Sequence, residues 1–221
     1  MSDRGGGIEV KPADDRRTFK HFVQLPYRIY DGDPNWVAPL IRDVKTAFNK
    51  KKHPFHTHSE VQPFVAFRDG RPVGRIAAIN NRNHVAYHEE PVGFFGYFEC
   101  INDPQVAAAL FDRTAEWLRE RGLQTMRGPA SFSLNEMAGL LTMGFDRPPT
   151  VMMPYNPEYY VYLVTGAGFE EVQSLIGYHL SHSYAPEKLL KLEKKLEKRL
   201  GVRTRTIDMN NFEGELERLR D

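Results

Sequence analysis

The dipeptide Asp69-Gly70 lies between two short apolar runs, and no other feature restricts the possible folds of this chain as strongly. The runs cover residues 64–67 and 73–79. An Asp-Gly pair readily adopts the backbone angles of a tight β-turn, so the two runs are expected to be strands of one antiparallel hairpin. A further apolar run over residues 92–99 is long enough to be another strand of the same sheet.

Helical patterns alternate with these strands. The clearest covers residues 104–121, where apolar side chains recur at helical spacing and Gly122 follows as a stop. Asp103 and Pro104 stand at its start, where a capping side chain and a first-turn proline are favoured. The other expected helices are a pattern opened by Asp14 and Asp15 that reaches Ile29, and residues 40–51, 135–141 and 157–166; the other expected strands are residues 8–10, 125–129, 170–176 and 178–181.

Charge and cysteine content exclude several classes of protein. The chain has 30 Lys and Arg against 29 Asp and Glu, so it lacks the basic excess of a dedicated nucleic-acid binder. Its single cysteine, Cys100, can form neither an intrachain disulfide framework nor a cysteine-based zinc site. No apolar run approaches the ~18 residues of a membrane span, and the opening MSDRGGG lacks the apolar core of a secretory signal. We therefore expect a cytoplasmic protein with neither nucleic acid nor a membrane among its partners.

The composition changes after about residue 182. Residues 186–200 read PEKLLKLEKKLEKRL, which predicts a charged amphipathic helix. Residues 203–209 are a possible strand, and residues 212–221 begin a helix. We therefore expect a flexible tail over residues 1–7, an α/β domain over 8–182, a charged helical linker over 183–202, and the start of a truncated second domain over 203–221.

The order of these elements, and several stretches of sequence, resemble the fold of the Gcn5-related N-acetyltransferases (GNAT). IEVKPADDRRTFKHF is similar to the first strand and helix of that fold, and FRDGRPVGRIAAI to its second and third strands. GFFGYFECINDPQVAAALFDRTAEWLRERG is similar to the fourth strand with its helix, and YYVYLVTGAGFEEVQSLIGYHL to the last helix and strand pair. With DPNWVAPL, FSLNEMAGLLTMGFD and VMMPYNPEYY, the chain resembles the N-terminal half of a bacterial family that has two acyltransferase-like halves.

This resemblance implies an α/β fold whose central, mostly antiparallel sheet is splayed between its fourth and fifth strands and flanked by helices. It implies transfer of an acyl group from acetyl-CoA or another acyl-CoA to the amine of a small molecule or peptide. In such enzymes the fourth strand holds the pantetheine, and backbone N–H groups at the next helix N-terminus bind the pyrophosphate. A strand amide stabilises the oxyanion, a carboxylate or water takes the amine proton, and a tyrosine on the last helix protonates the thiolate.

The candidate site residues are those on which these roles fall in this sequence. Glu99 ends the fourth strand, where a general base could lie, and Tyr159 and Tyr160 on the last helix are further catalytic candidates. The expected acyl-CoA contacts are Phe98, Glu99, Cys100, Gln105, Val106 and Ala107. The proline-rich stretch 131–160 is expected to form the wall of the substrate cleft, with Asn135, Glu136, Tyr155 and Asn156.

Two positions depart from the family pattern. In the loop over residues 102–107 only Ala107 fits the pyrophosphate motif, and a capping Asp103 would occupy the donors that phosphate needs. Val164 stands where the tyrosine that protonates the thiolate is expected. The alternative is therefore a catalytically inactive GNAT-like module for binding or scaffolding. In that case Glu99 is a charge facing water, the tyrosines are wall residues, and the stretch 131–160 is a structural cover.

The histidines form two groups that suggest a metal site at first sight. His53, His56 and His58 lie in one segment, and His84 and His88 are four residues apart. No carboxylate or cysteine at a suitable spacing completes a set of ligands, so surface loops are favoured and no metal is expected. Phosphate-binding loops, serine-hydrolase elbows and zinc-protease motifs are also absent from the sequence.

Overall fold

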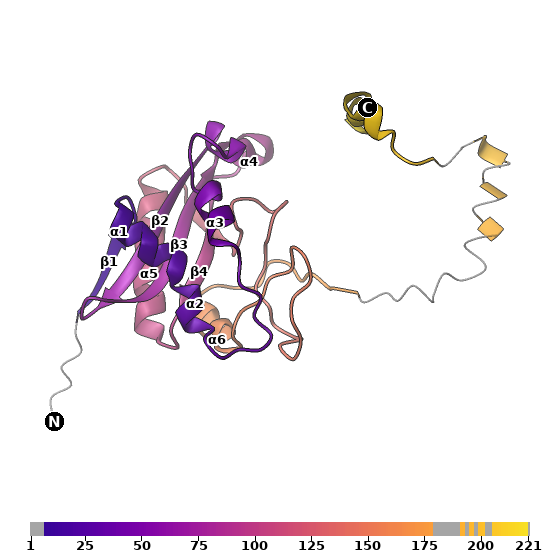
Figure 1. Cartoon of the computed structure of the whole chain (residues 1–221). Helices are drawn as coiled ribbons and strands as arrows, with labels where there is room; N and C mark the ends of the chain where they lie inside the picture. Colours follow the sequence, from indigo (N-terminus) through magenta and orange to yellow (C-terminus); the bar gives the residue numbers. More distant parts are fainter. Residues whose placement is uncertain (1–6, 179–190, 193–194, 197–198, 202–204, 221) are drawn as a thin grey trace. The chain divides into compact units, whose positions relative to one another are not determined.

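The computed structural model describes residues 7–178, 191–192, 195–196, 199–201 and 205–220. The chain forms two compact units, Met1–Ser174 and Leu175–Asp221. The first contains a five-stranded sheet in the order β1-β2-β3-β4-β5, so every strand lies beside its neighbour in sequence (Figure 1).

The predicted hairpin is the centre of this sheet. Asp69 and Gly70, both at positive φ, join β2 (Ser59–Arg68) to β3 (Arg71–Asn81). β1 (Ile8–Pro12) pairs antiparallel with β2, and β4 (Val92–Cys100) pairs antiparallel with β3. The antiparallel part of the sheet is thus built from consecutive strands, as the turn chemistry predicts.

A bulge interrupts the pairing of β3 with β4. Arg75 lies opposite Glu99, but Ala77 lies opposite Gly96, so β4 has one more residue than β3 between the two pairs. Tyr97, in the bulge, has a φ of 50°, which is uncommon for a bulky residue. The bulge resets the alternation of side chains along the last residues of β4.

The sheet is splayed beyond the first residues of β4. β5 (Thr125–Arg127) pairs parallel with Val92–Phe94, and the Ala130 N–H then donates to the Phe95 carbonyl oxygen at 2.8 Å. Within the described part of the chain, no strand continues along this edge of β4. The splay between the fourth and fifth strands is therefore present, as expected, and it leaves the last residues of β4 with an open edge.

Gly96 makes the close approach at the splay possible. A Cβ at this position would lie 1.9 Å from the Ala130 carbonyl oxygen, so backbone would have to move. We expect Gly96→Ala to lower the free energy of unfolding by about 2 kcal/mol or more, measured by urea denaturation. The matched control is Gly166→Ala, where a Cβ meets nothing within 4 Å and which should change stability by about 0.5 kcal/mol at most. Equal effects of the two substitutions would contradict the close approach.

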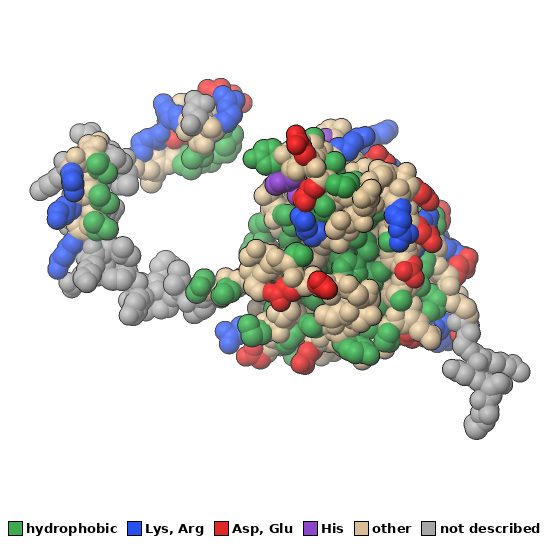
Figure 2. Space-filling view, turned by 180° about the vertical axis from the view of Figure 1, so that it is seen from behind, with side chains coloured by type: hydrophobic (Ala, Val, Ile, Leu, Met, Phe, Trp, Pro, Cys, Tyr) green, Lys and Arg blue, Asp and Glu red, His purple; other side chains and the backbone are tan. Residues whose placement is uncertain are grey.

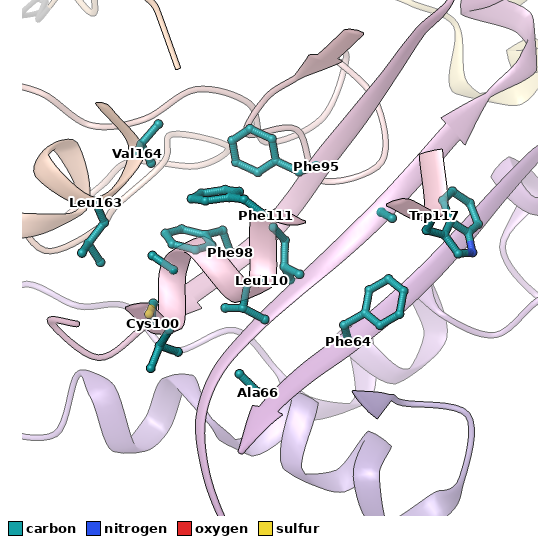
Figure 3. Packing of buried hydrophobic residues seen from close by; sticks show 14 of the residues in the cluster. Phe64, Ala66, Phe95, Phe98, Cys100, Leu110, Phe111, Trp117, Leu163 and Val164 are labelled. Atoms are coloured by element: carbon teal, nitrogen blue, oxygen red, sulfur yellow. The ribbon is translucent and has the colours of Figure 1, made fainter. Parts of the chain in front are cut away.

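Helices cover both faces of the sheet (Figure 1). On one face lie α1 (Arg16–Gln24), α2 (Pro26–Ile29) and α3 (Ile41–Ala47). On the other lie α5 (Pro104–Arg119) and α6 (Tyr159–Gly166), with Leu110 and Phe111 packed on the strands (Figure 3). The Phe111 ring stacks on Phe98 at 4.8 Å and meets Phe95 edge-on at 5.2 Å. Phe95 and Phe98, which lie on either side of Tyr97 in the bulge, therefore both face this side.

A second core on the α1–α3 face includes a residue of the long loop after β5. Phe132 is fully buried, and its ring packs against those of Phe48, Phe55 and Tyr97. The loop is therefore anchored in the core by an aromatic side chain.

On the face shown in Figure 2, acidic and basic side chains are interspersed among hydrophobic ones.

Several elements differ from the sequence prediction. Residues 135–141 form turns instead of a helix, because Gly139 has a φ of 99° and Ala138 bridges to Ala130. Residues 170–176 form no strand, because they have no ladder partner, and Val172 is 73% exposed. Residues 205–208 are not a strand either. The connection that contains His84 and His88 is a helix, α4 (Arg82–His88), and Pro54–Thr57 form the 3-10 helix η1.

The described residues of the second unit form short helical pieces and the irregular stretches 175–178 and 205–208. Residues 191–192, 195–196 and 199–200 are helical, in keeping with the amphipathic pattern. η2 (Met209–Asn211) leads into α8 (Phe212–Arg220), the helix expected near the end of the chain. Residues 1–6, 179–190, 193–194, 197–198, 202–204 and 221, which include most of the expected strand 178–181, lie outside the described residues.

Candidate active site

Glu99 is the centre of a polar cluster at the open edge of β4. Its side chain is 14% exposed. The hydroxyls of Tyr30, which follows α2, and of Tyr160 on α6 both donate to Oε2 at 2.8 Å. Arg75 on β3 places Nη2 3.4 Å from Oε1. Groups from both layers of helices and from the sheet therefore converge on one carboxylate.

The environment of Glu99 raises the pKa of its carboxyl group. Burial raises the pKa of Glu99, and the opposing effects of Arg75, Tyr160 and Tyr30 do not cancel it. Burial, followed by the neighbouring Glu99 charge, also raises the pKa of Tyr30 and of Tyr160. Both phenols therefore keep their protons at neutral pH, and the pKa of Glu99 lies above that of an ordinary glutamate.

Arg75 is fixed in place beside this carboxylate. The residue is 4% exposed, and Nη1 donates to the Phe22 carbonyl oxygen at 2.8 Å. Its guanidinium lies over the rings of Phe22 at 4.9 Å and Tyr97 at 5.8 Å. Nε has no hydrogen-bond partner in the described part of the chain. A buried positive charge held this firmly offsets part of the cost of burying the Glu99 carboxylate.

Two neighbouring tyrosines cover the open edge of β4. The Cys100 N–H donates to the Tyr160 hydroxyl, and the Tyr159 hydroxyl donates to the Cys100 carbonyl oxygen, both at 2.8 Å. Burial raises the pKa of Tyr159 to about 12 and that of the Cys100 thiol to about 12. The backbone of Cys100, where the family resemblance places a pantetheine contact, is thus already bonded to α6. The side chain of Phe98 packs in the core, so only its backbone could contact a ligand.

A cavity of about 290 Å³ adjoins Tyr159. It lies between the first helices, the start of β3 and the loop after β4. Its lining residues are Leu25, Arg28, Ile29, Pro72, Ile101, Asn102 and Tyr159. The cavity can hold a small chemical group next to Tyr159, and the polar side chains of Arg28 and Asn102 in its lining could bind such a group.

The predicted Asp103 cap of α5 is confirmed. Oδ1 accepts from the N–H groups of Gln105 at 2.9 Å and Val106 at 3.3 Å, and Arg68 Nη1 lies 2.5 Å from Oδ2. Burial opposes ionisation of Asp103, but Arg68 and the two N–H groups outweigh it and lower its pKa. Gln105 is exposed, whereas Val106 and Ala107 are buried in the core. The donors that a pyrophosphate would use are therefore bonded to a carboxylate.

Tyr155 is the expected cleft residue that reaches the Glu99 cluster. Its hydroxyl donates to Asp33 Oδ2 at 2.8 Å, and its ring lies 6.1 Å from that of Tyr30. Its carbonyl oxygen also accepts from the Tyr30 hydroxyl at 3.5 Å. The long loop after β5 thus forms one wall beside the cluster.

The other expected cleft residues lie in different settings. Asn156 is buried and joins two parts of the loop. Its Oδ1 accepts from the Leu141 N–H at 2.7 Å, and its Nδ2 donates to the Leu141 carbonyl oxygen at 3.2 Å. Glu136 is half-buried, burial raises its pKa, and its charge also contributes to the raised pKa of Tyr97. Asn135 is exposed. Asn156 is therefore a loop-stabilising residue, and Glu136 is near Tyr97 and its bulge.

The histidines gather no ligand set in the described residues. No three His, Cys, Asp or Glu side chains there are placed to hold a metal ion. His84 Nε2 lies 3.0 Å from Glu90 Oε1, which also pairs with Arg127 at 3.2 Å. Among all the residues that the structure describes, no helix is both long enough and apolar enough to cross a membrane.

Two curated relatives match almost the whole chain, whereas no protein-family model matches it. A protein named bacterial ceramide synthase from Caulobacter vibrioides (strain NA1000 / CB15N) is 35% identical over 213 residues, which are 96% of this chain and 56% of that protein. Protein YghO of Escherichia coli (strain K12) is 32% identical over 215 residues, 96% of this chain and 54% of that protein. The chain thus spans about half the length of the curated relatives it matches.

Solved structures of acetyltransferases are also similar to it. An aminoglycoside acetyltransferase from a soil metagenomic sample, in complex with sisomicin, has a TM-score of 0.47 and 14% identity, covering 81% of this chain and 99% of that one. A tandem GNAT protein from the clavulanic acid pathway has a TM-score of 0.49 and 14% identity, covering 73% of this chain and 43% of that one. By its own strand order, its bulged fourth strand and the splay that follows, this chain resembles the GNAT acyltransferases in fold.

Proposed function

We propose that this chain is an N-acyltransferase module that moves an acyl group from acyl-CoA to an amine. The observation that carries the proposal is the enclosed Glu99 carboxylate, held by Tyr30, Tyr160 and Arg75 where β4 becomes open. The relative named bacterial ceramide synthase supports this reaction class, because a ceramide is a long-chain amine acylated on its nitrogen. We therefore propose a long-chain lipid amine as the acceptor.

In this proposal Glu99 is the general base. Oε2 already accepts two phenolic hydrogen bonds, whereas Oε1 has the 3.4 Å contact with Arg75 and can take the amine proton. The amine nitrogen attacks the thioester carbonyl, the C–N bond forms and the C–S bond breaks. The Tyr160 hydroxyl, bonded to Glu99, gives its proton to the leaving thiolate and is reprotonated from Glu99. A base with a raised pKa suits this role, because it holds the proton long enough to pass it on.

The alternative proposal is a binding or scaffolding module without catalysis. It is favoured by Asp103, which occupies the N–H groups of Gln105 and Val106, and by the two tyrosines bonded to Cys100. Each of these contacts would have to be displaced or bypassed before acyl-CoA could bind in the manner of the family.

The test is a calorimetric titration of the chain with a long-chain acyl-CoA, followed by a thiol-release assay with a long-chain amine. We expect acyl-CoA to bind and free CoA to appear when the amine is added. Binding without release of CoA would support the scaffolding module. The absence of any binding, for acyl-CoA and for free CoA, would rule out the acyltransferase.

A further inference from the structure

Two loops expose an unusual share of large hydrophobic side chains. The loops are residues 31–41, between α2 and the start of α3, and residues 131–153, after β5. Their exposed hydrophobic residues, here called the apolar loop surface, are Val37, Leu40, Ile41, Leu134, Met137, Met143, Val151, Met152 and Met153. In the rest of the described α/β unit, the large hydrophobic side chains of similar exposure are Tyr87, Tyr162 and Val172. Such a concentration on ordinary globular proteins marks an interaction site.

The two loops are joined to each other by specific bonds. Asn35 Nδ2 donates to the Phe145 carbonyl oxygen at 3.2 Å, and the Tyr155 hydroxyl donates to Asp33 at 2.8 Å. Figure 1 shows the loop after α2 running alongside the long loop after β5. Within the first loop, Trp36 stacks on Tyr30 with ring centroids 4.8 Å apart. The apolar side chains are therefore exposed on an ordered part of the fold.

Basic residues follow the apolar loop surface along the chain. Between residues 37 and 52 the sequence has five basic residues and one acidic residue, Asp43, which pairs with Arg42 at 3.5 Å. Lys45 and residues 50–52, all lysines, are exposed and have no acidic side chain within 4.0 Å in the described part of the chain. Lys45 is one helical turn from Ile41, so positive charge adjoins the apolar residues. On the second loop Arg147 pairs with Asp146 at 3.5 Å.

We infer that the apolar loop surface docks on an anionic lipid bilayer, with the adjoining lysines facing the lipid headgroups. Apolar side chains at loop tips enter the headgroup boundary, and each nearby Lys adds attraction to anionic lipid. This replaces the expectation of no membrane partner, which rested on the lack of a spanning segment, because surface docking needs none. A nucleic acid could pair with the lysines, but it would leave the nine hydrophobic side chains without a partner.

Docking would also serve the proposed function. The Tyr30 hydroxyl, which bonds Glu99, also contacts the Tyr155 carbonyl oxygen at 3.5 Å, next to the second loop. A lipid amine in the bilayer would therefore be presented beside the Glu99 cluster. This last step rests on the proposed acyltransferase, whereas docking itself does not.

The test is flotation of the full chain with vesicles of phosphatidylglycerol and phosphatidylethanolamine, compared with phosphatidylcholine vesicles. We expect binding to the anionic vesicles that weakens with added salt. Val151→Asp is expected to lower the partition coefficient by about tenfold or more, since it puts a charge in place of an exposed apolar side chain that would enter the bilayer. Lys45→Glu together with Lys51→Glu is expected to lower it to a similar extent.

Two matched variants separate this surface from other exposed hydrophobic residues. Tyr87→Asp, on α4, and Leu196→Asp, in the amphipathic stretch of the second unit, change side chains that are 83% and 41% exposed. Both should bind vesicles like the parent chain. Loss of binding in Leu196→Asp but not in Val151→Asp would overturn the proposal, and so would an absence of vesicle binding by the parent chain. Self-association that Val151→Asp abolishes, without vesicle binding, would assign the surface to a second copy instead. Because flotation needs no turnover, its result is independent of the acyltransferase test.

Discussion

Glu99→Gln is expected to lower kcat for acyl transfer by about 100-fold or more, because an amide cannot accept the amine proton. The substitution keeps the shape of the side chain. The amide oxygen can still accept hydrogen bonds from the hydroxyls of Tyr30 and Tyr160, which donate to Glu99 Oε2 at 2.8 Å in the parent chain. The loss should therefore appear in kcat rather than in the affinity for acyl-CoA, measured by calorimetry on the same variant.

The pH profile gives a second readout of the same prediction. Burial raises the pKa of Glu99, and the base must be ionised to act, so the rate of the parent chain should fall as pH decreases through that raised pKa. Glu99→Gln should lack this acidic limb. A variant with the parent rate, or with the same acidic limb, would remove Glu99 from the mechanism.

An exposed carboxylate serves as the control. Asp112 lies on α5 and is not hydrogen-bonded to Glu99. Asp112→Asn should therefore retain the parent rate within about threefold. If Glu99→Gln does not fold, as judged by thermal unfolding, Tyr30→Phe keeps the idea testable. It removes one donor that lowers the pKa of Glu99, so the acidic limb should move to higher pH.

The parts of the fold that depend on local sequence could be predicted. The Asp69-Gly70 turn pairs Arg68 with Arg71, although a bulge between Ala66 and Phe67 shifts the register further along the hairpin. The spacing from Val106 to Leu118 defines α5 without reference to other elements. Residues 135–141 and 170–176 could not be predicted this way. The first segment is held by the bridge from Ala138 to Ala130, and the second lacks the neighbouring strand that its β-forming residues need.

The candidate site was only partly accessible from the sequence. Glu99 and Tyr160 could be named, because their positions at a strand end and on the last helix follow from the order of elements. Arg75 was missed, although a single charge inside the apolar run 73–79 was a usable signal. Its position opposite Glu99 depends on the bulge at Tyr97, which breaks the simple alternation of β4. Tyr30 was missed because it lies 69 residues from Glu99 and no periodic pattern joins them.

Asp103→Asn is expected to tighten acyl-CoA binding by tenfold or more. In the parent chain the Asp103 carboxylate lies at the N-terminus of α5, bonded to the N–H groups of Gln105 and Val106. A phosphate at the same place would meet a like charge, and like charges 4 Å apart at an effective dielectric of about 20 repel by about 4 kcal/mol. Salt and small movements reduce this, but about 1.4 kcal/mol already changes affinity tenfold.

This substitution would keep the cap of α5 while removing the charge, since asparagine is as good a helix cap as aspartate. It would also release Arg68, now 2.5 Å from Asp103 Oδ2, to pair with phosphate. The measurement is calorimetry with acyl-CoA, and the control is Asp112→Asn, an exposed carboxylate further along α5 that should leave the affinity unchanged. If both variants bound acyl-CoA more tightly by the same factor, the cause would be the change in net charge and not the position of Asp103. If neither the parent chain nor Asp103→Asn binds CoA or acyl-CoA, the α5 N-terminus is no phosphate site at all, and the binding module is then the better account of this domain.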